Sequence, residues 1–90
     1  MDFSKALTAL KQGSKLTRTG WNGSGQFIVS QKGYPTGIAI NKNTSEATGL
    51  PVGTTCIFRP YIMLRTADGS FVPWVATQSD ILENDWEIPQ

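Results

Sequence analysis

Apolar side chains near the start of the chain recur at helical spacing and predict a helix over residues 2–12. They are Phe3, Ala6, Leu7 and Leu10, with lysines on the rest of the surface. Asp2 is placed to cap the helix or to interact with its N-terminal dipole. Gly13 is a stop signal, because glycine ends helices at low steric cost. We expect this helix to pack on a sheet.

Most of the remaining apolar residues alternate with polar ones, which is the pattern of β-strands. The predicted strands cover residues 15–19, 26–31, 54–66, 70–75 and 85–88. The first two flank a glycine-rich tip and predict a hairpin, and the third is expected to bend at Pro60. Residues 77–84 predict a short helix that Thr77 or Ser79 can cap.

The segment between residues 32 and 54 has the weakest pattern. Gly33-Tyr34-Pro35 predicts a turn, and residues 37–40 predict a brief strand. Residues 41–53 are mostly Asn, Thr, Ser and Gly, a composition typical of a mobile surface loop. Some loops of this kind close over a ligand. With no ligand in view, we expect a surface loop here.

A tight hairpin is predicted around Asp68-Gly69, which lies between two apolar runs. In the register of a two-residue turn, one face is apolar and consists of Ile62, Leu64 and Val75. The other face consists of Arg59, Tyr61, Met63, Arg65, Val72 and Trp74. This second face has aromatic surface and two guanidinium groups but no carboxylate, so it suits a planar, anionic ligand. Pro73 either places the return strand at an edge of the sheet or ends it early, because proline cannot donate to a ladder.

Chain length and the order of these elements define the expected fold. A chain of 90 residues can build one core, so we expect a single domain over residues 1–90. The predicted class is α+β. An N-terminal helix packs on a small antiparallel β-sheet, and a short second helix lies near the C-terminus.

The net charge of +1 gives no support for bulk binding of DNA or of an anionic membrane. Charge is nevertheless distributed unevenly. Residues 1–45 hold six Lys or Arg and one Asp, whereas residues 46–90 hold two Arg and six Asp or Glu. The two halves can pair within a protomer or between protomers, and we expect pairing within the protomer.

The single cysteine, Cys56, excludes an intrachain disulfide and fits a reducing compartment. No stretch approaches the length of a transmembrane helix, and the N-terminus lacks the pattern of a signal peptide. We therefore expect a soluble, cytoplasmic protein.

Several kinds of catalytic and metal chemistry lack the residues that they need. The chain has no histidine, which removes the commonest general base and a frequent metal ligand. It also has no P-loop and no GxGxxG motif. The acidic cluster, which consists of Asp80, Glu83, Asp85 and Glu87, lacks EF-hand spacing, and we interpret it as a solvated acidic face. We expect no catalytic residue, no metal site and no cofactor, although an enzyme built on carboxylates alone stays conceivable.

Binding chemistry is better represented, first in the glycine-rich loop. Trp21 offers a stacking surface there, and Asn22 beside it offers a donor and an acceptor for a base edge. The alternative is that Trp21 plugs the end of the sheet while Asn22 takes a left-handed turn geometry. The sequence does not decide between these two interpretations.

A second candidate group belongs to the predicted hairpin. Arg59 precedes Pro60, whose fixed backbone would hold the guanidinium for bidentate contact with phosphate. The alternative for Arg59 is a surface ion pair with Asp80 or Glu83. Trp74 could belong to the core, but the predicted register places it beside Arg59.

A set of short motifs runs along the chain. They are Phe3-x-x-Ala6-Leu7-x-x-Leu10-x-x-Gly13, Arg18-x-Gly20-Trp21-Asn22-Gly23, Arg59-Pro60, Thr66-Ala67-Asp68-Gly69, Val72-Pro73-Trp74-x-Ala76-x-Gln78-x-Asp80 and Asp85-Trp86. Taken together, they resemble a small phage domain family that includes the second type of Thoeris anti-defence protein. The match runs from end to end apart from residues 32–54, where that family varies.

This resemblance implies a signal sponge. Thoeris defence makes a cyclised ADP-ribose messenger from NAD during infection, and members of the family bind that messenger intact and keep it from the effector. Members are homotetramers with pockets between protomers, and some also bind cyclic di- or trinucleotides. By the family pattern, the ligand-facing positions are Trp21, Asn22, Arg59, Trp74, Gln78 and Asp80, with Phe3 and Phe27 as further candidates. Tyr61 joins them from the predicted ligand face of the hairpin.

The combined prediction is a non-enzymatic sponge for cyclic ADP-ribose-type signals in the cytoplasm of the host bacterium, with no DNA and no membrane partner. Two rivals remain. One is an enzyme that degrades the signal, and the other is a protein-interaction or virion-assembly module.

Overall fold

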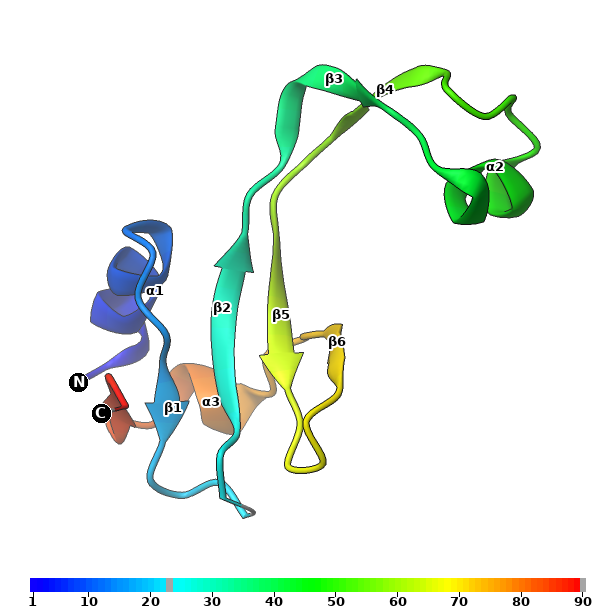
Figure 1. Cartoon of the computed structure of the whole chain (residues 1–90). Coiled ribbons are helices and arrows are strands. Elements are labelled where there is room, and N and C mark those ends of the chain that lie inside the picture. Colours follow the sequence, from blue (N-terminus) through cyan, green and yellow to red (C-terminus); the bar gives the residue numbers. More distant parts are fainter. Residues whose placement is uncertain (23, 90) are drawn as a thin grey trace.

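The computed structural model describes residues 1–22 and 24–89 and shows a body from which an arm extends (Figure 1). We define the arm as residues 34–58, and the rest of the chain as the body. The molecule is elongated as a result, with principal extents of 45 × 27 × 25 Å.

The elements are helices and short strands that alternate irregularly along the chain. In order they are α1 (Phe3–Lys11), β1 (Thr17–Arg18), β2 (Phe27–Gln31), β3 (Tyr34–Ala39), α2 (Lys42–Thr48), β4 (Thr55–Phe58), β5 (Tyr61–Arg65), β6 (Phe71–Pro73), α3 (Gln78–Leu82) and β7 (Trp86–Glu87). The strands form the antiparallel sheets β2–β5–β6 and β1–β7 in the body and β3–β4 in the arm. The predicted α+β class is confirmed. The helix predicted near the C-terminus is α3, because the arm contains an additional helix, α2.

Packing of α1 against the three-stranded sheet builds the core. Asp2 caps the helix by accepting the N–H of Lys5 at 2.8 Å, and Gly13 follows it with a φ of +97°. The buried cluster consists of Ala6, Leu10, Leu16, Ile28 and Trp86. These side chains come from α1, from β2, from the residue before β1 and from β7. The two ends of the chain therefore meet on one face of the sheet (Figure 1).

The hairpin predicted over residues 15–31 is confirmed only as a single antiparallel bridge. Among the described residues, Leu16 and Ile28 bridge these two segments, and each N–H donates to the other's carbonyl, at 3.0 and 2.8 Å. Beyond this bridge β1 pairs with β7, and Arg18 lies opposite Trp86. A long, glycine-rich connection does not fix the register of the two segments that it joins. β1 therefore takes the C-terminal strand β7 as its partner.

The hairpin between β5 and β6 turns through three residues, where two were predicted. Thr66 and Ser70 close the loop through an N–H···O bond of 2.8 Å, and Gly69 takes a φ of +91°. The Asp68 carboxylate accepts the N–H of Ser70 at 2.9 Å, which favours this longer loop. The pairing of β5 with β6 is therefore shifted by one position from the predicted register.

That shift changes which residues share a face. The N–H of Trp74 donates to the carbonyl of Ile62 at 3.0 Å, and both side chains pack against the core. Trp74 is therefore not on the face of Tyr61, where the two-residue turn placed it. Val75, predicted to belong to the apolar core face, is 85% exposed.

The arm contains a helix where the composition predicted a loop. α2 begins after Asn41, whose side chain accepts the N–H of Thr44 at 3.0 Å, and it ends at Gly49 with a φ of +80°. None of its residues is buried, so no apolar stripe marked it in the sequence. The turn predicted at residues 33–35 is also wrong, because Tyr34 begins β3.

The predicted long central strand is two strands, because Arg59 and Pro60 interrupt it between β4 and β5. The bend expected at Pro60 is therefore confirmed. Gly33, on the neighbouring segment, approaches so closely that a Cβ there would collide with the carbonyl oxygen of Phe58. We call this close crossing of two backbones, where the arm leaves the body, the junction.

Gly33→Ala should destabilise the protein more than Gly49→Ala does. At Gly49 a Cβ meets nothing within 4 Å, so the cost is the strain of its left-handed φ of +80°, about 1 kcal/mol. At Gly33 the new Cβ would collide with backbone atoms, so the two segments must separate. Urea unfolding followed by circular dichroism measures both changes, and equal losses would contradict the close crossing.

Candidate functional site

The predicted ligand-facing residues fall into three groups in different parts of the structure. The first group lies at the end of the body near α3 and consists of Phe3, Trp21, Trp74 and Asp80, with the exposed Asn22 and Gln78 adjacent in sequence. The second group, Arg59 and Tyr61, lies at the junction. The third is Phe27, on the sheet beside Arg65. Gly23, which the loop motif includes, lies outside the described residues.

Trp86 is the centre of the first group. It is 1% exposed, and its indole N–H donates to the backbone carbonyl of Asp80 at 2.7 Å. Trp21 meets it edge-on with ring centroids 5.3 Å apart, and Phe3 and Trp74 lie at 5.7 and 6.0 Å. Trp86 is therefore structural, and the other three rings use part of their surface to pack around it.

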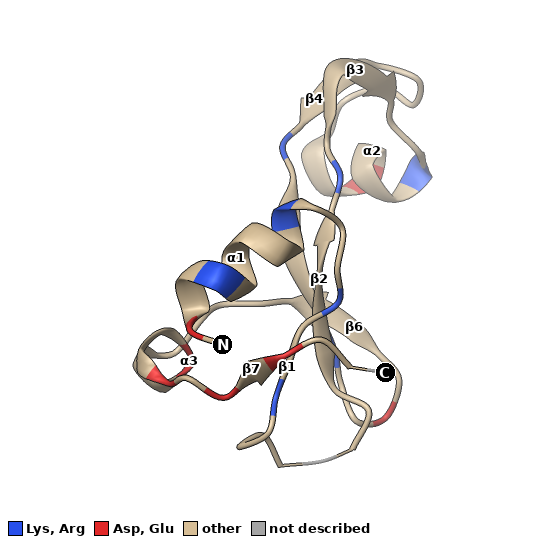
Figure 2. Ribbon diagram, turned by 90° about the vertical axis from the view of Figure 1, so that its left-hand side faces the viewer, with Lys and Arg blue, Asp and Glu red and all other residues tan. Residues whose placement is uncertain are grey.

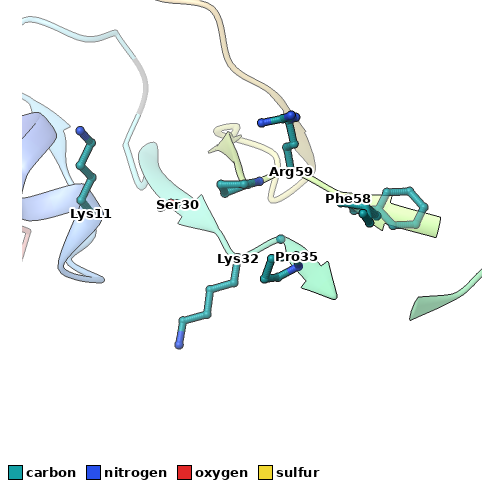
Figure 3. A pocket seen from close by; sticks show the side chains of 9 residues that line it. Lys11, Ser30, Lys32, Pro35, Phe58 and Arg59 are labelled. Carbon is teal, nitrogen blue, oxygen red and sulfur yellow. The ribbon is translucent and has the colours of Figure 1, made fainter. Parts of the chain in front are cut away.

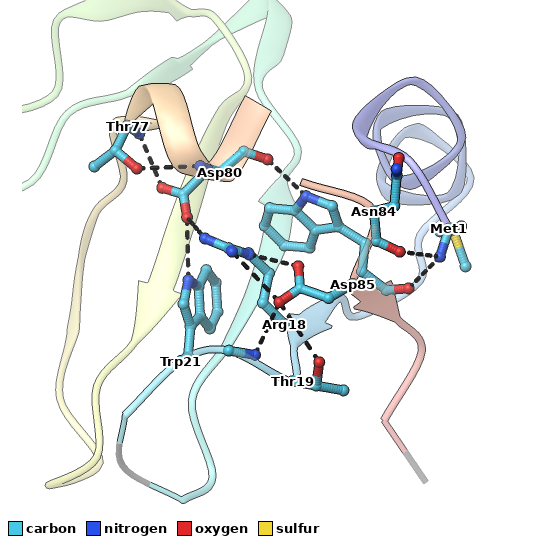
Figure 4. Close-up of polar contacts among 10 residues, drawn as sticks. Met1, Arg18, Thr19, Trp21, Thr77, Asp80, Asn84 and Asp85 are labelled. Atoms are coloured by element: carbon cyan, nitrogen blue, oxygen red, sulfur yellow. Dashed lines mark hydrogen bonds and ion pairs between the residues drawn. The ribbon is translucent and has the colours of Figure 1, made fainter. Parts of the chain in front are cut away.

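Arg18 joins this aromatic group to two carboxylates (Figure 4). Its Nη1 donates to Oδ1 of Asp80 at 2.8 Å, and its Nε donates to Oδ1 of Asp85 at 2.7 Å. The indole N–H of Trp21 donates to the same Asp80 oxygen at 3.1 Å, and the N–H of Gly20 donates to Oδ2 of Asp85 at 2.9 Å. We call Arg18, Trp21, Asp80 and Asp85 the Arg18 clamp. It connects β1 to α3 and to the residue before β7.

The clamp corrects the interpretation of the acidic cluster. Asp80 is 5% exposed, so the cluster is not a solvated face at that position. Its guanidinium partner is Arg18, and the alternative pairing of Asp80 with Arg59 does not occur. The expected pairing of the basic and acidic halves within one protomer is confirmed for Arg18.

Opposing effects set the pKa of Asp80. Burial raises the pKa, but the backbone N–H of Thr77, the guanidinium of Arg18 and the indole of Trp21 together lower it below its ordinary value of 3.8. The pKa of Asp85 is also lowered, chiefly by its hydrogen bond from Arg18. Both carboxylates are therefore charged at neutral pH. Asp80 also completes a capping box with Thr77 at the start of α3.

A pocket of about 710 Å³ opens at the junction (Figure 3). Three cationic side chains border it: Lys11 at the end of α1, Lys32 after β2 and Arg59 between β4 and β5. Phe58 and Pro35 contribute apolar surface, and no carboxylate is among its lining residues. We call this the junction pocket. Its chemistry suits an anionic ligand that also has an apolar or planar part.

A neighbouring pocket of about 390 Å³ shares Lys32 and Arg59 with the junction pocket. Its aromatic lining residues Tyr34, Phe58 and Tyr61 are 46, 38 and 51% exposed. The junction thus combines cations with open aromatic surface. That combination was predicted for Arg59 and Tyr61, but the hairpin partner expected beside them, Trp74, lies elsewhere.

The charges near the junction have no acidic partners in the described part of the chain. The ion pairs among the described residues involve Arg18 and Lys42, and none involves Lys11, Lys32 or Arg59. The acidic residues of the C-terminal segment lie around α3 and β7, away from the junction (Figure 2). An approaching anion therefore meets uncompensated positive charge at the junction pocket.

Sequence reasoning identified Arg59 but missed Lys11, Lys32 and Phe58. Lys11 and Lys32 are far apart in the sequence and come together because β2 pairs with β5 while α1 packs on the same sheet. Only a correct prediction of strand pairing could have brought these two lysines together. The predicted hairpin instead paired residues 26–31 with residues 15–19. Phe58 was read as part of a strand and not as a pocket wall.

The described residues include neither a metal-binding cluster nor a membrane-spanning helix. They contain no group of three or more His, Cys, Asp or Glu side chains placed to hold a metal ion. No helix formed by residues 1–22 and 24–89 is long and apolar enough to cross a membrane.

Comparison with known proteins covers the chain almost completely and points to phage anti-defence proteins. The family model described as Tad2-like, the Thoeris anti-defense 2-like domain, matches residues 1–89. Thoeris anti-defense 2 of Bacillus phage SP01 is 34% identical over 88 residues, which is 98% of this chain and 93% of that protein. The chain belongs to the Thoeris anti-defense 2-like family.

The resemblance inferred from the motifs is thereby confirmed. Family membership supports a role in phage anti-defence, and the family is named for that role and not for an enzymatic activity.

The Arg18 clamp predicts a loss of stability in acid. The folded pKa of Asp80 lies below the ordinary value of 3.8, so its charge stabilises the fold above about that pH. This contribution is lost as the pH falls through the folded pKa. We expect the midpoint of urea unfolding, followed by tryptophan fluorescence, to fall steeply below about pH 4.

Asp80→Asn tests whether the clamp causes this loss. The variant leaves a buried guanidinium with one carboxylate fewer, so it should be about 3 kcal/mol less stable at pH 7. The difference from the wild type should shrink toward pH 3. The matched control is Glu83→Gln, an exposed position in the same acidic cluster. If Asp80→Asn kept the acid sensitivity of the wild type, the clamp would not be its source.

Proposed function

We propose that this protein is a phage anti-defence sponge that binds a cyclic ADP-ribose-type immune signal and withholds it from the host effector without degrading it. The observation that carries the proposal is the junction pocket. Three cations, no carboxylate and an aromatic wall border one cavity, in a chain that belongs to an anti-defence family. The alternatives are an enzyme that degrades the signal and a protein-interaction or virion-assembly module.

The junction pocket matches the chemistry of such a signal. A cyclised ADP-ribose has two phosphates and an adenine ring, so it needs charge-assisted donors and a flat apolar surface. Lys32 and Arg59 can donate to phosphate oxygens, and Arg59 offers a planar fork suited to bidentate contact. Stacking of a base on Phe58 would contribute about 1–3 kcal/mol. The volume of about 710 Å³ lies within the usual range for small-ligand pockets.

The side chains around the junction pocket favour binding over turnover. Ser30 is the one hydroxyl side chain in its lining, and no histidine or carboxylate stands beside it as a base. Lysine and arginine side chains supply hydrogen-bond donors and offer no acceptor for a proton. A sponge needs this inertness, because each site must hold its ligand unchanged for as long as the effector is present.

We further propose that the working unit is a homotetramer with pockets completed between protomers. In one chain the candidate residues around Trp21 and those at the junction belong to separate ends of the body. A single ligand could contact both groups if they came from different protomers. Cyclic di- and trinucleotides, which share phosphates and flat bases with the messenger, are further candidate ligands. The expected place of action is the cytoplasm of the host bacterium, where the messenger is made.

Arg59→Ala should weaken the binding of cyclic ADP-ribose isomers at least tenfold. The substitution removes the one fork-shaped cation from the junction pocket and leaves the apolar core untouched. Isothermal titration calorimetry measures the affinity. The control, Lys5→Ala, removes a charge from the exposed side of α1 and should bind as the wild type does. Unchanged affinity in Arg59→Ala would move the site away from the junction.

The ligand released from the complex should be chemically intact. Protein saturated with a cyclic ADP-ribose isomer is incubated for hours and heated, and the released ligand is identified by mass spectrometry. Light scattering of the same sample before it is heated should give the mass of a tetramer. A hydrolysed ligand would establish the enzyme instead. If no cyclic nucleotide binds at all, the interaction module becomes the leading function.

A further inference from the structure

The arm joins the body through two short segments that belong to no strand. The β2–β5 ladder of the body and the β3–β4 ladder of the arm both stop before they meet. Lys32-Gly33 connects them on one side, and Arg59-Pro60 connects them on the other. We call these four residues the hinge. Because no strand ladder crosses the hinge, the orientation of the arm is not fixed by strand pairing.

Packing does not fix this orientation either. In the described part of the chain, no helix or strand of the arm packs against a helix or strand of the body, and the arm stands away from it (Figure 1). The hydrogen bonds of Ile40 with Thr54 and Gly53 close the arm on itself. The radius of gyration is 15.7 Å, whereas a compact chain of this length has one of about 12 Å. With so little surface buried between arm and body, different arm angles differ little in free energy.

The hinge residues differ in their conformational freedom. Gly33 has no side chain, so its backbone can turn at low cost. Pro60 has a fixed φ and also restricts the residue before it, Arg59. The close crossing of Gly33 with the carbonyl of Phe58 is the point where the two segments touch. We therefore expect rotation about this crossing, with the torsion changes at Lys32-Gly33 and with a range that Pro60 limits.

The junction pocket spans the hinge. Lys11 and Ser30 line it from the body, whereas Pro35, Ile57 and Phe58 line it from the arm (Figure 3). Ile57 is 68% exposed and Phe58 is 38% exposed, so the wall that the arm supplies is not packed on the body. A change in the arm angle therefore changes the width of the junction pocket.

We propose that the arm is a hinged lid over the junction pocket and that the bound ligand sets its angle. A ligand that contacts Lys11 on the body and Phe58 on the arm makes both contacts at one arm angle. It therefore selects that angle from those that the free protein samples. Closure brings apolar surface over the ligand and excludes water. The closure rests on the proposed function, whereas the motion of the arm in the free protein does not.

Double electron–electron resonance on the full-length protein measures the distance between arm and body. Cys56, the single cysteine, is replaced by Ser, and spin labels are attached at Thr55→Cys on β4 and at Lys5→Cys on the exposed side of α1. Labelled chains are mixed with an excess of unlabelled protein, so that each distance lies within one chain. We expect a broad distance distribution in the free protein. Saturation with a cyclic ADP-ribose isomer should make it narrower and shift it to shorter distances.

Two controls accompany this measurement. Labels at Lys5→Cys and Glu83→Cys both lie on the body and should give one narrow distribution with and without ligand. Pro60→Gly frees the hinge, so it should broaden the distribution of the free protein further. It should also weaken binding about two- to fivefold in calorimetry, because closure must then order more backbone. Pro51→Gly makes the same change at an exposed position between α2 and β4 and should alter neither result.

The possible failures are distinguishable. If the free protein gave a distance between arm and body as narrow as that of the pair on the body, the hinge would be overturned. If calorimetry showed binding but the distribution stayed the same, the lid would be overturned while the proposed function stood. If no cyclic ADP-ribose isomer bound, the proposed function and the closure would fail together. The width of the distribution in the free protein would still decide whether the arm is hinged.

Discussion

One buried guanidinium holds together elements that could not persist alone. β1 and β7 are two residues long and α3 is five, well below the lengths at which helices or strand pairs are stable in water. Arg18 reaches from β1 to Asp80 and Asp85, and the indole N–H of Trp86 donates to the backbone carbonyl of Asp80. A buried ion pair contributes little net stability compared with an apolar replacement. Its effect here is to fix the relative positions of the two chain ends.

The sequence was most informative where local chemistry decides the outcome. α1 followed from its apolar stripe, its aspartate cap and its glycine stop, all of which act within a few residues. α2 has the same caps, Asn41 and Gly49, but no buried face, so its signals looked like those of a loop. The pairing of β1 with β7 could not be read locally, because it joins residues almost seventy positions apart. The hairpin register depended on whether Asp68 would support a longer loop, which two side-chain contacts decide.

In the candidate site, too, the features set by local sequence were predicted and those set by distant contacts were not. Arg59 was identified because proline fixes the backbone beside it. Trp21 and Asp80 were also identified, but composition cannot distinguish a ring that awaits a ligand from a ring packed on Trp86. Several of the motif residues that carry the family resemblance are needed for the fold itself. A Cβ at Gly20, for example, would lie 2.7 Å from Oδ2 of Asp85. Such motifs therefore identify the family securely while leaving the ligand contacts to be found by geometry.

β5 sets the distance between two arginines in this molecule. Arg59 precedes it by two residues and Arg65 is its last residue, while Ile62 and Leu64 pack against the core. Because side chains alternate along a strand, one inserted or deleted residue in β5 would exchange its core and solvent faces and misplace both arginines. The far end of the arm, between Gly49 and Gly53, is under no such constraint, since added side chains there meet open space. Insertions, labels or reporter peptides therefore belong at the tip of the arm, where the length of the chain can vary without changing any spacing in the body.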